Sequence, residues 1–249
     1  MSLLNGWLLA PLETKQDLLK RKKVLFEAPF AKEKVFPLPL YDLEEIEVCM
    51  HYSDESLFPW QGAALWEYFT EEGDKYPVIQ LRTKEIKNFL SRCSKEEVLT
   101  HELVHAARFA FKEPFFEEMF AYQTSSSSLR RFWGSFFIYP IESVFFAAAS
   151  LLSPLISIFL SPSWGVYFLI SLFFFFFFRL LILHSFFSLC KFKLRKVGFL
   201  PLPTMIRLAD LEIVKIALFP LKKIHCFFER GSQKEVRLEE IVNFYFKGK

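Results

Sequence analysis

Two long apolar runs constrain this chain more than any other feature of its sequence. Residues 136–160 and residues 166–190 each exceed the roughly 20 apolar residues that an α-helix needs to cross a bilayer. Between them, residues 161–165 read SPSWG, where Pro and Gly indicate a turn and Trp favours the membrane interface. We therefore predict a helical transmembrane hairpin over residues 132–190, with the lipid bilayer as its partner.

Basic residues flank this hairpin at both ends: Arg130 and Arg131 before it, and Lys191, Lys193, Arg195 and Lys196 after it. The turn between the two runs carries no charge. Because Lys and Arg are retained on the cytoplasmic side of a membrane, both ends of the hairpin are expected there. The sequence thus predicts a multi-pass membrane protein with two helices and both termini in the cytoplasm.

Three ionisable residues lie within the predicted hairpin. If the two runs pair antiparallel about the turn, Glu142 is level with His184 near the cytoplasmic edge, and Arg179 is level with Ala147 deeper in the membrane. Charged side chains are costly in a bilayer and often mark a function, such as a polar contact with a soluble domain. The alternative is that Glu142 and His184 are interfacial and that Arg179 snorkels or faces a partner.

A short motif with chemical potential precedes the hairpin. His101-Glu102-Leu103-Val104-His105 has the form HExxH. On a helix, residues four apart lie on one face, so both imidazoles can bind one metal ion while Glu102 lies close to a water beside it. This is the arrangement of a zinc hydrolase with two His ligands and a carboxylate base.

The neighbouring residues support a helix and offer a further ligand. Ser94 is a natural N-cap, with Glu97 three residues later to complete a capping box, and Pro114 ends the apolar periodicity. A carboxylate pair, Glu117-Glu118, then opens a second helical segment. The simpler alternative is a polar surface helix followed by a solvated helix start.

The segment resembles the gluzincin metallopeptidases, in which HExxH is followed by P-x-W-L-x-E-G-x-A-x-Y. Here the corresponding residues, 114–122, read PFFEEMFAY. The resemblance implies a zincin-like fold and a Zn²⁺ ion held by His101, His105 and Glu118. It also implies peptide-bond hydrolysis by a metal-activated water, with Glu102 as the general base and a peptide or protein as the substrate.

Glu117 remains an alternative third ligand, because Met119 replaces the glycine of the family pattern. Adjacent residues on a helix point about 100° apart, so only one of the two glutamates can face both histidines. Ala121 lies on the face of Glu118, where its small side chain would let two helices approach closely. This favours Glu118.

The remaining segments give coarser expectations. Residues 43–52 and 76–83 read as strands, whereas residues 63–69 and 84–90 read as short helices. In zincins a strand beside the active-site helix commonly binds the extended substrate. The strand at 76–83 is a candidate for that role, and an ordinary sheet strand is the equal alternative.

The residues after the hairpin are expected to form helices at 204–218, capped by Thr204, and at 237–246. Asp210 or Glu212 could orient a zinc-bound histidine, although surface charge is the commoner explanation.

Four other residues are weaker candidates for the site. His51 and His225 are reserve metal ligands, and Arg108 and Tyr122 are candidate oxyanion-stabilising residues that could also be merely solvated or packed.

Composition excludes some classes of protein. The net charge of +3 gives no reason to expect nucleic-acid binding, and four scattered cysteines without CxxC spacing indicate neither a zinc ribbon nor a disulfide framework. The N-terminal MSLLNGWLLAPLETK lacks a basic leader and reads as an amphipathic or membrane-skimming start.

We expect an α+β protein: a small zincin-like metallopeptidase domain with an inserted two-helix transmembrane hairpin. Residues 1–131 form the catalytic domain, residues 132–190 the hairpin, and residues 191–249 a cytoplasmic helical segment packed on the catalytic domain. The alternative is a non-enzymatic membrane protein whose bilobed hydrophobic hairpin inserts in a membrane, for example a host-derived one, and recruits partners.

Overall fold

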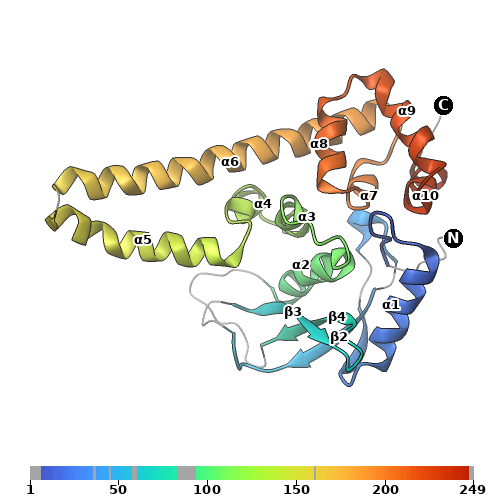
Figure 1. The fold of residues 1–249 in the computed structure, drawn as a ribbon, viewed down its shortest axis with the longest axis horizontal. Coiled ribbons are helices and arrows are strands. Elements are labelled where there is room, and N and C mark those ends of the chain that lie inside the picture. The colour runs from blue at the N-terminus through green and yellow to red at the C-terminus, as the bar shows by residue number, and fades with distance from the viewer. Residues whose placement is uncertain are drawn as a thin grey trace.

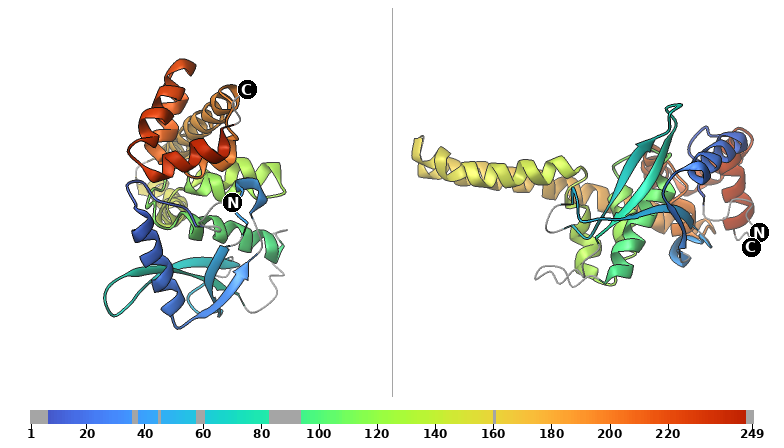
Figure 2. Two further views of the ribbon diagram at one scale, coloured as in Figure 1. Left: turned by 90° about the vertical axis from the view of Figure 1, so that its right-hand side faces the viewer. Right: turned by 90° about the horizontal axis from the view of Figure 1, so that it is seen from below.

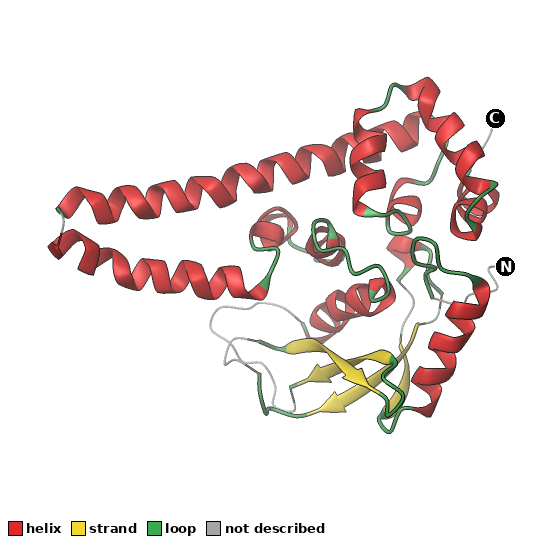
Figure 3. Ribbon diagram, viewed as in Figure 1, coloured by secondary structure: helices red, strands yellow, loops and turns green. Residues whose placement is uncertain are grey.

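A computed structural model describes residues 7–35, 38–44, 46–57, 61–82, 94–159 and 161–246 of the chain. The fold is mixed α+β, as expected, with one sheet and many helices (Figures 1 and 3). The elements before the hairpin are α1 (Lys15–Glu27), β1 (Ala31–Val35), η1 (Pro39–Tyr41), β2 (Ile46–Tyr52), β3 (Ala63–Phe69), β4 (Lys75–Leu81), α2 (Lys95–Arg108), α3 (Glu117–Gln123), α4 (Ser128–Trp133) and η2 (Gly134–Phe136). The hairpin and the tail comprise α5 (Pro140–Phe159), α6 (Pro162–Lys196), α7 (Pro201–Met205), α8 (Asp210–Leu218), α9 (Leu221–Ser232) and α10 (Val236–Tyr245).

The sheet has the strand order β1-β2-β4-β3, in which β2 and β4 are parallel and the other pairs are antiparallel. The strands expected at 43–52 and 76–83 correspond to β2 and β4. The helix expected at 63–69 is wrong, because these residues form β3, and the helix expected at 84–90 lies outside the described residues. Trp, Tyr and Phe in this segment favour a strand, and Tyr68 stacks on Tyr76 across the β3–β4 pair.

The residues after the hairpin form shorter helices than expected. The predicted helix at 204–218 is interrupted: Thr204 belongs to α7, and α8 begins after Ala209, whose N–H donates to the Glu212 carboxylate. The carbonyls of Ile206 and Leu208 in the interruption accept hydrogen bonds from Arg108 instead of continuing a helix. The helix expected at 237–246 is α10.

One hydrophobic core joins the parts of the chain on either side of the hairpin. It combines sheet residues such as Ile79 with Leu103 of α2, Phe120 of α3, Leu194 of α6 and Ile213 of α8. Residues 7–10 are buried within the protein, and do not form the membrane-skimming start that their composition suggested. The tail therefore packs on the N-terminal part, as expected.

Helices α5 and α6 project from the rest of the molecule as an antiparallel hairpin (Figures 1 and 2). Both are long and apolar enough to cross a membrane, and most of each apolar span is exposed. Near the tip Gly165 lets the helices approach closely, since a Cβ there would lie 2.2 Å from the Ser157 hydroxyl oxygen. After the hairpin, α6 continues and packs against α8.

The pairing of charges in the hairpin differs from the expected register. Arg179 was expected to lie level with Ala147. Instead, its side chain donates to both carboxylate oxygens of Glu142, at 2.6 and 2.7 Å. Helix α6 already begins at Pro162, so the residues expected to form the turn belong to the helix and the register shifts. His184 lies beside the Phe132 carbonyl, 2.9 Å away.

We expect Arg179→Met to destabilise the hairpin by about 1 to 3 kcal/mol, because it leaves the Glu142 carboxylate unpaired. The measurement is unfolding of the detergent-solubilised protein by sodium dodecyl sulfate. The double variant Arg179→Met/Glu142→Gln serves as the control, and should recover at least half of the loss. A single variant as stable as the parent would contradict a stabilising role for this pair.

Candidate metal centre

Helix α2 carries the HExxH residues. Ser94 caps its beginning as expected, but Glu97 does not complete the predicted capping box, because its side chain binds Arg130. The Ser94 hydroxyl accepts a hydrogen bond from the Glu97 N–H at 3.1 Å. The Glu97 carboxylate accepts from Arg130 of α4, at 2.7 and 2.8 Å, and so ties the start of α2 to α4. Leu103 and Val104 on the opposite face are buried in the core, which orients the two histidines towards α3.

Helix α3 runs beside α2 and supplies the carboxylates (Figure 1). Phe116 and Phe120 are fully buried and anchor α3 in the core. Ala121 is also fully buried, as expected of a small residue where two helices meet. These anchors fix the rotation of α3, and therefore decide what each of its adjacent glutamates can reach.

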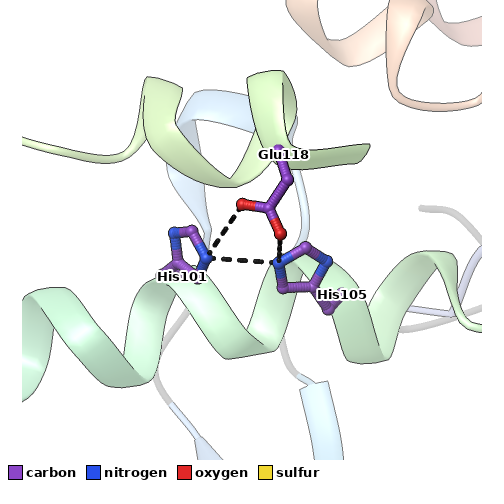
Figure 4. A group of neighbouring side chains, drawn as sticks. All are labelled: His101, His105 and Glu118. Atoms are coloured by element: carbon purple, nitrogen blue, oxygen red, sulfur yellow. Dashed lines mark hydrogen bonds and ion pairs between the residues drawn. The ribbon is translucent and has the colours of Figure 1, made fainter. Parts of the chain in front are cut away.

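His101, His105 and Glu118 converge on one point (Figure 4). The Nε2 atoms of the two histidines are 3.2 Å apart. One oxygen of Glu118 lies 3.5 Å from Nε2 of His101, and its other oxygen lies 3.5 Å from Nε2 of His105. Zinc bonds of about 2.0 to 2.15 Å in a tetrahedral site separate the ligand atoms by roughly 3.3 to 3.5 Å. The nearest separations in the cluster are close to these values, so the three side chains could hold a metal ion such as zinc.

Glu117 binds the other side of His105. Its carboxylate lies 3.2 Å from Nδ1 of His105 and accepts a hydrogen bond from Nε of Arg108 at 3.0 Å. A carboxylate can only accept, so Nδ1 carries a proton. When the ring is neutral, its Nε2 therefore presents a lone pair to the cluster. Glu117 thus orients a histidine, as carboxylates commonly do around zinc, while Glu118 faces both histidines.

Arg108 does not stabilise an oxyanion in this arrangement, contrary to one expectation. Its side chain is fully buried, and it donates to Glu117 and to the carbonyls of Ile206 and Leu208. Its guanidinium lies over the rings of Phe111 and Phe120. Arg108 therefore fixes the position of the Glu117 carboxylate.

Asp210 and Glu212 do not orient a histidine either. Asp210 lies 3.7 Å from Arg108, and accepts a hydrogen bond from the Phe115 N–H. Glu212 pairs with Arg237. The orienting role expected of these tail residues belongs to Glu117, and the tail is linked to Glu117 through Arg108.

Burial and neighbouring charges change the protonation of the cluster. Burial lowers the pKa of His101, and the charge of His105 lowers it further. Burial also lowers the pKa of His105, but Glu118 and Glu117 outweigh this effect and raise it to about 10. Burial raises the pKa of Glu118 to about 7. A proton on His105 thus occupies the place where the donor atoms meet, and metal binding would release it.

Glu102 lies beside this cluster, on the side of β3. Its carboxylate accepts a hydrogen bond from the backbone N–H of Leu65. Burial raises the pKa of Glu102, while His105 and the Leu65 N–H oppose that effect. A half-buried carboxylate with a raised pKa, next to a candidate metal site, has the properties of a general base.

These residues line a cleft of about 650 Å³. Its walls are formed by the start of β3, the ends of α2 and α3, and the beginning of α5: Gln61, Ala63, Ala64, Leu65, His101, Glu102, His105, Arg108, Phe109, Lys112, Glu113, Pro114, Glu117, Glu118, Tyr122, Tyr139 and Pro140. The Tyr122 ring meets His101 edge-on, with centroids 4.6 Å apart. Gly134 makes room for that ring, because a Cβ there would come within 2.2 Å of it.

The reserve ligands lie elsewhere. His51 is on β2 and contacts Phe30, and His225 is on α9 and contacts Phe246. Sequence reasoning missed the Leu65 N–H and the pair Tyr139-Pro140. The role of the Leu65 N–H could not be predicted once residues 63–69 were read as a helix. The Tyr139-Pro140 pair could have been used, because a proline at the start of an apolar run indicates where a helix begins.

Comparison with protein-family models, curated proteins and solved structures gave no match for this chain. The resemblance to the gluzincins therefore stays a prediction that rests on residues 101–122.

The contacts of the two glutamates predict different effects on zinc affinity. Glu118→Ala removes a ligand and should weaken zinc binding by at least about 100-fold. Glu117→Ala removes the partner of Nδ1 and should weaken it by about 10-fold. Competition with a zinc chelator measures both, with Glu113→Ala, at the cleft wall, as the matched control. A larger loss in Glu117→Ala would reverse the two roles.

Proposed function

We propose that this chain is a membrane-anchored, zinc-dependent metallopeptidase. The observation that carries the proposal is the triangle of His101, His105 and Glu118 with the half-buried carboxylate of Glu102 beside it. A zinc ion held there would lower the pKa of a water towards about 7, and would polarise the carbonyl of a bound peptide. The cleft contains the three ligands and the carboxylate base that this chemistry requires.

The residues of the chain divide the chemistry among them. Glu102 accepts the proton that the water gives up as its oxygen attacks the carbonyl carbon. The carbon–nitrogen bond then breaks, and Glu102 passes the proton to the leaving amine. Tyr122 lines the cleft and is the remaining candidate for stabilising the oxyanion.

The strand best placed to bind an extended peptide is β3. Strand β4 is paired on both sides, by β2 and β3, so its backbone groups are already used. Strand β3 is at the edge of the sheet, and Ala63, Ala64 and Leu65 line the cleft. A substrate that added to this edge would pass Glu102.

We also propose that the site faces the cytoplasm. The basic residues at the ends of the hairpin favour this orientation, and α1 and α10, near the two ends of the described chain, lie at the end of the molecule away from the hairpin tip (Figure 1). In the alternative, a non-enzymatic membrane protein, the hairpin would serve the same anchoring purpose without zinc. Metal content therefore separates the two functions.

Glu102→Gln should retain about one zinc per chain and lose nearly all hydrolysis, because it removes the base and leaves the ligands. Elemental analysis of detergent-purified protein gives the zinc content, and mass spectrometry of a peptide mixture gives the cleavage. The parent protein is the control. Parent protein without zinc would exclude the proposed mechanism, and so would undiminished cleavage by the variant.

Membrane orientation can be tested by cysteine labelling of intact cells. Cys226 is exposed on the protein surface, whereas Cys49 and Cys190 are buried. An impermeant reagent added from outside should therefore miss Cys226 and reach a cysteine introduced at Ser163, in the first turn of α6 at the tip of the hairpin. After cell lysis it should reach both. Labelling of Cys226 in intact cells would place the site on the opposite side.

A further inference from the structure

The start of α5 fixes the level of the membrane surface relative to the cleft. Helix α5 has 20 residues, and at about 1.5 Å per residue it is roughly 30 Å long, which equals the thickness of the hydrocarbon core of a bilayer. If α5 spans the bilayer, Pro140 must lie at its surface. Tyr139 precedes it and is 46% exposed, at the level where aromatic side chains are favoured.

The metal cleft reaches this same level. Tyr139 and Pro140 are part of its wall, together with His101, His105 and Glu118. The candidate zinc site is therefore next to the membrane surface. A peptide in the cleft would pass close to the lipid headgroups.

An apolar pocket of about 340 Å³ adjoins the cleft. The two share Lys112, Glu113 and Pro114, and the pocket is lined further by Phe115, Phe116, Leu183, Phe186, Asp210, Leu211 and Val214. Its exposed lining is almost entirely apolar, so it suits an aliphatic or aromatic side chain.

The pocket also lies at the membrane surface. Arg179 pairs with Glu142, so the α6 residue level with Pro140 is about two positions after Arg179. At about 1.5 Å per residue, Leu183 and Phe186 then lie roughly 3 and 8 Å outside the bilayer. The cleft and the pocket together form one binding surface along the membrane.

We infer that the substrate is itself anchored in the membrane and is cut within the first few residues outside the bilayer, with an apolar side chain in the pocket formed by α6, α8 and residues 112–116. This inference rests on the proposed peptidase function. A substrate in the same membrane gains a high effective concentration at the cleft, which a soluble peptide lacks.

The test uses the full chain in phosphatidylcholine vesicles and three peptides that share one cleavable segment, rich in Leu and Phe. The first peptide joins the segment directly to a transmembrane helix. The second inserts a long Gly-Ser spacer, and the third lacks the helix. We expect the first to be cut at least tenfold faster than the others, at bonds next to the membrane.

The outcomes separate the inference from the function on which it rests. Equal rates for all three peptides would leave a peptidase and overturn the membrane-anchored substrate. No cleavage of any peptide by the zinc-loaded protein would remove the peptidase function, and this inference with it.

The role of the pocket is tested with two leucines of α8. Leu211 lines the pocket and is 61% exposed, whereas Leu218 is 65% exposed and outside the lining. Leu211→Ser should slow cleavage of the anchored peptide at least fivefold and leave the zinc content unchanged. Leu218→Ser should change neither. Equal rates for the two variants would exclude the pocket from substrate binding.

Discussion

The structure depends on one buried cation, the guanidinium of Arg108. It has no exposed surface, and a charge in that position must be compensated by hydrogen bonds and opposite charges. Its partners come from different parts of the chain: Glu117 on α3, and the carbonyls of Ile206 and Leu208 before α8. Satisfying this single charge brings α2, α3 and the tail together.

The same contacts determine the geometry of the candidate metal site. Arg108 holds Glu117, Glu117 holds the Nδ1 side of His105, and the opposite side of that ring then faces His101 and Glu118. Two adjacent glutamates can take different roles because they point in different directions from one helix. The rotation of α3 is set by its buried phenylalanines, so packing in the core fixes the chemistry at the surface of the cleft.

The sequence predicted the features that are encoded locally. The cap at Ser94, the helix through His101 and His105, and the two apolar helices all follow from short-range patterns. The sequence could not predict Arg108 as a link to the tail, because its carbonyl partners are about 100 residues away. Strand β3 was misread because a short apolar run can be read as either a helix or a strand. Its aromatic residues favour a strand, and its pairing with β4 stabilises that conformation.

The contacts of Arg108 also imply an order in which the parts of the chain can come together during synthesis. The carbonyl of Ile206 is 98 residues beyond Arg108, and both hairpin helices lie between them. While the ribosome is still translating the hairpin, Ile206 and Leu208 have not yet been synthesised. The guanidinium of Arg108 therefore cannot donate to their carbonyls. The contacts that hold Glu117 beside His105 are therefore complete only after the residues beyond the hairpin have been synthesised and have packed against the N-terminal part of the chain.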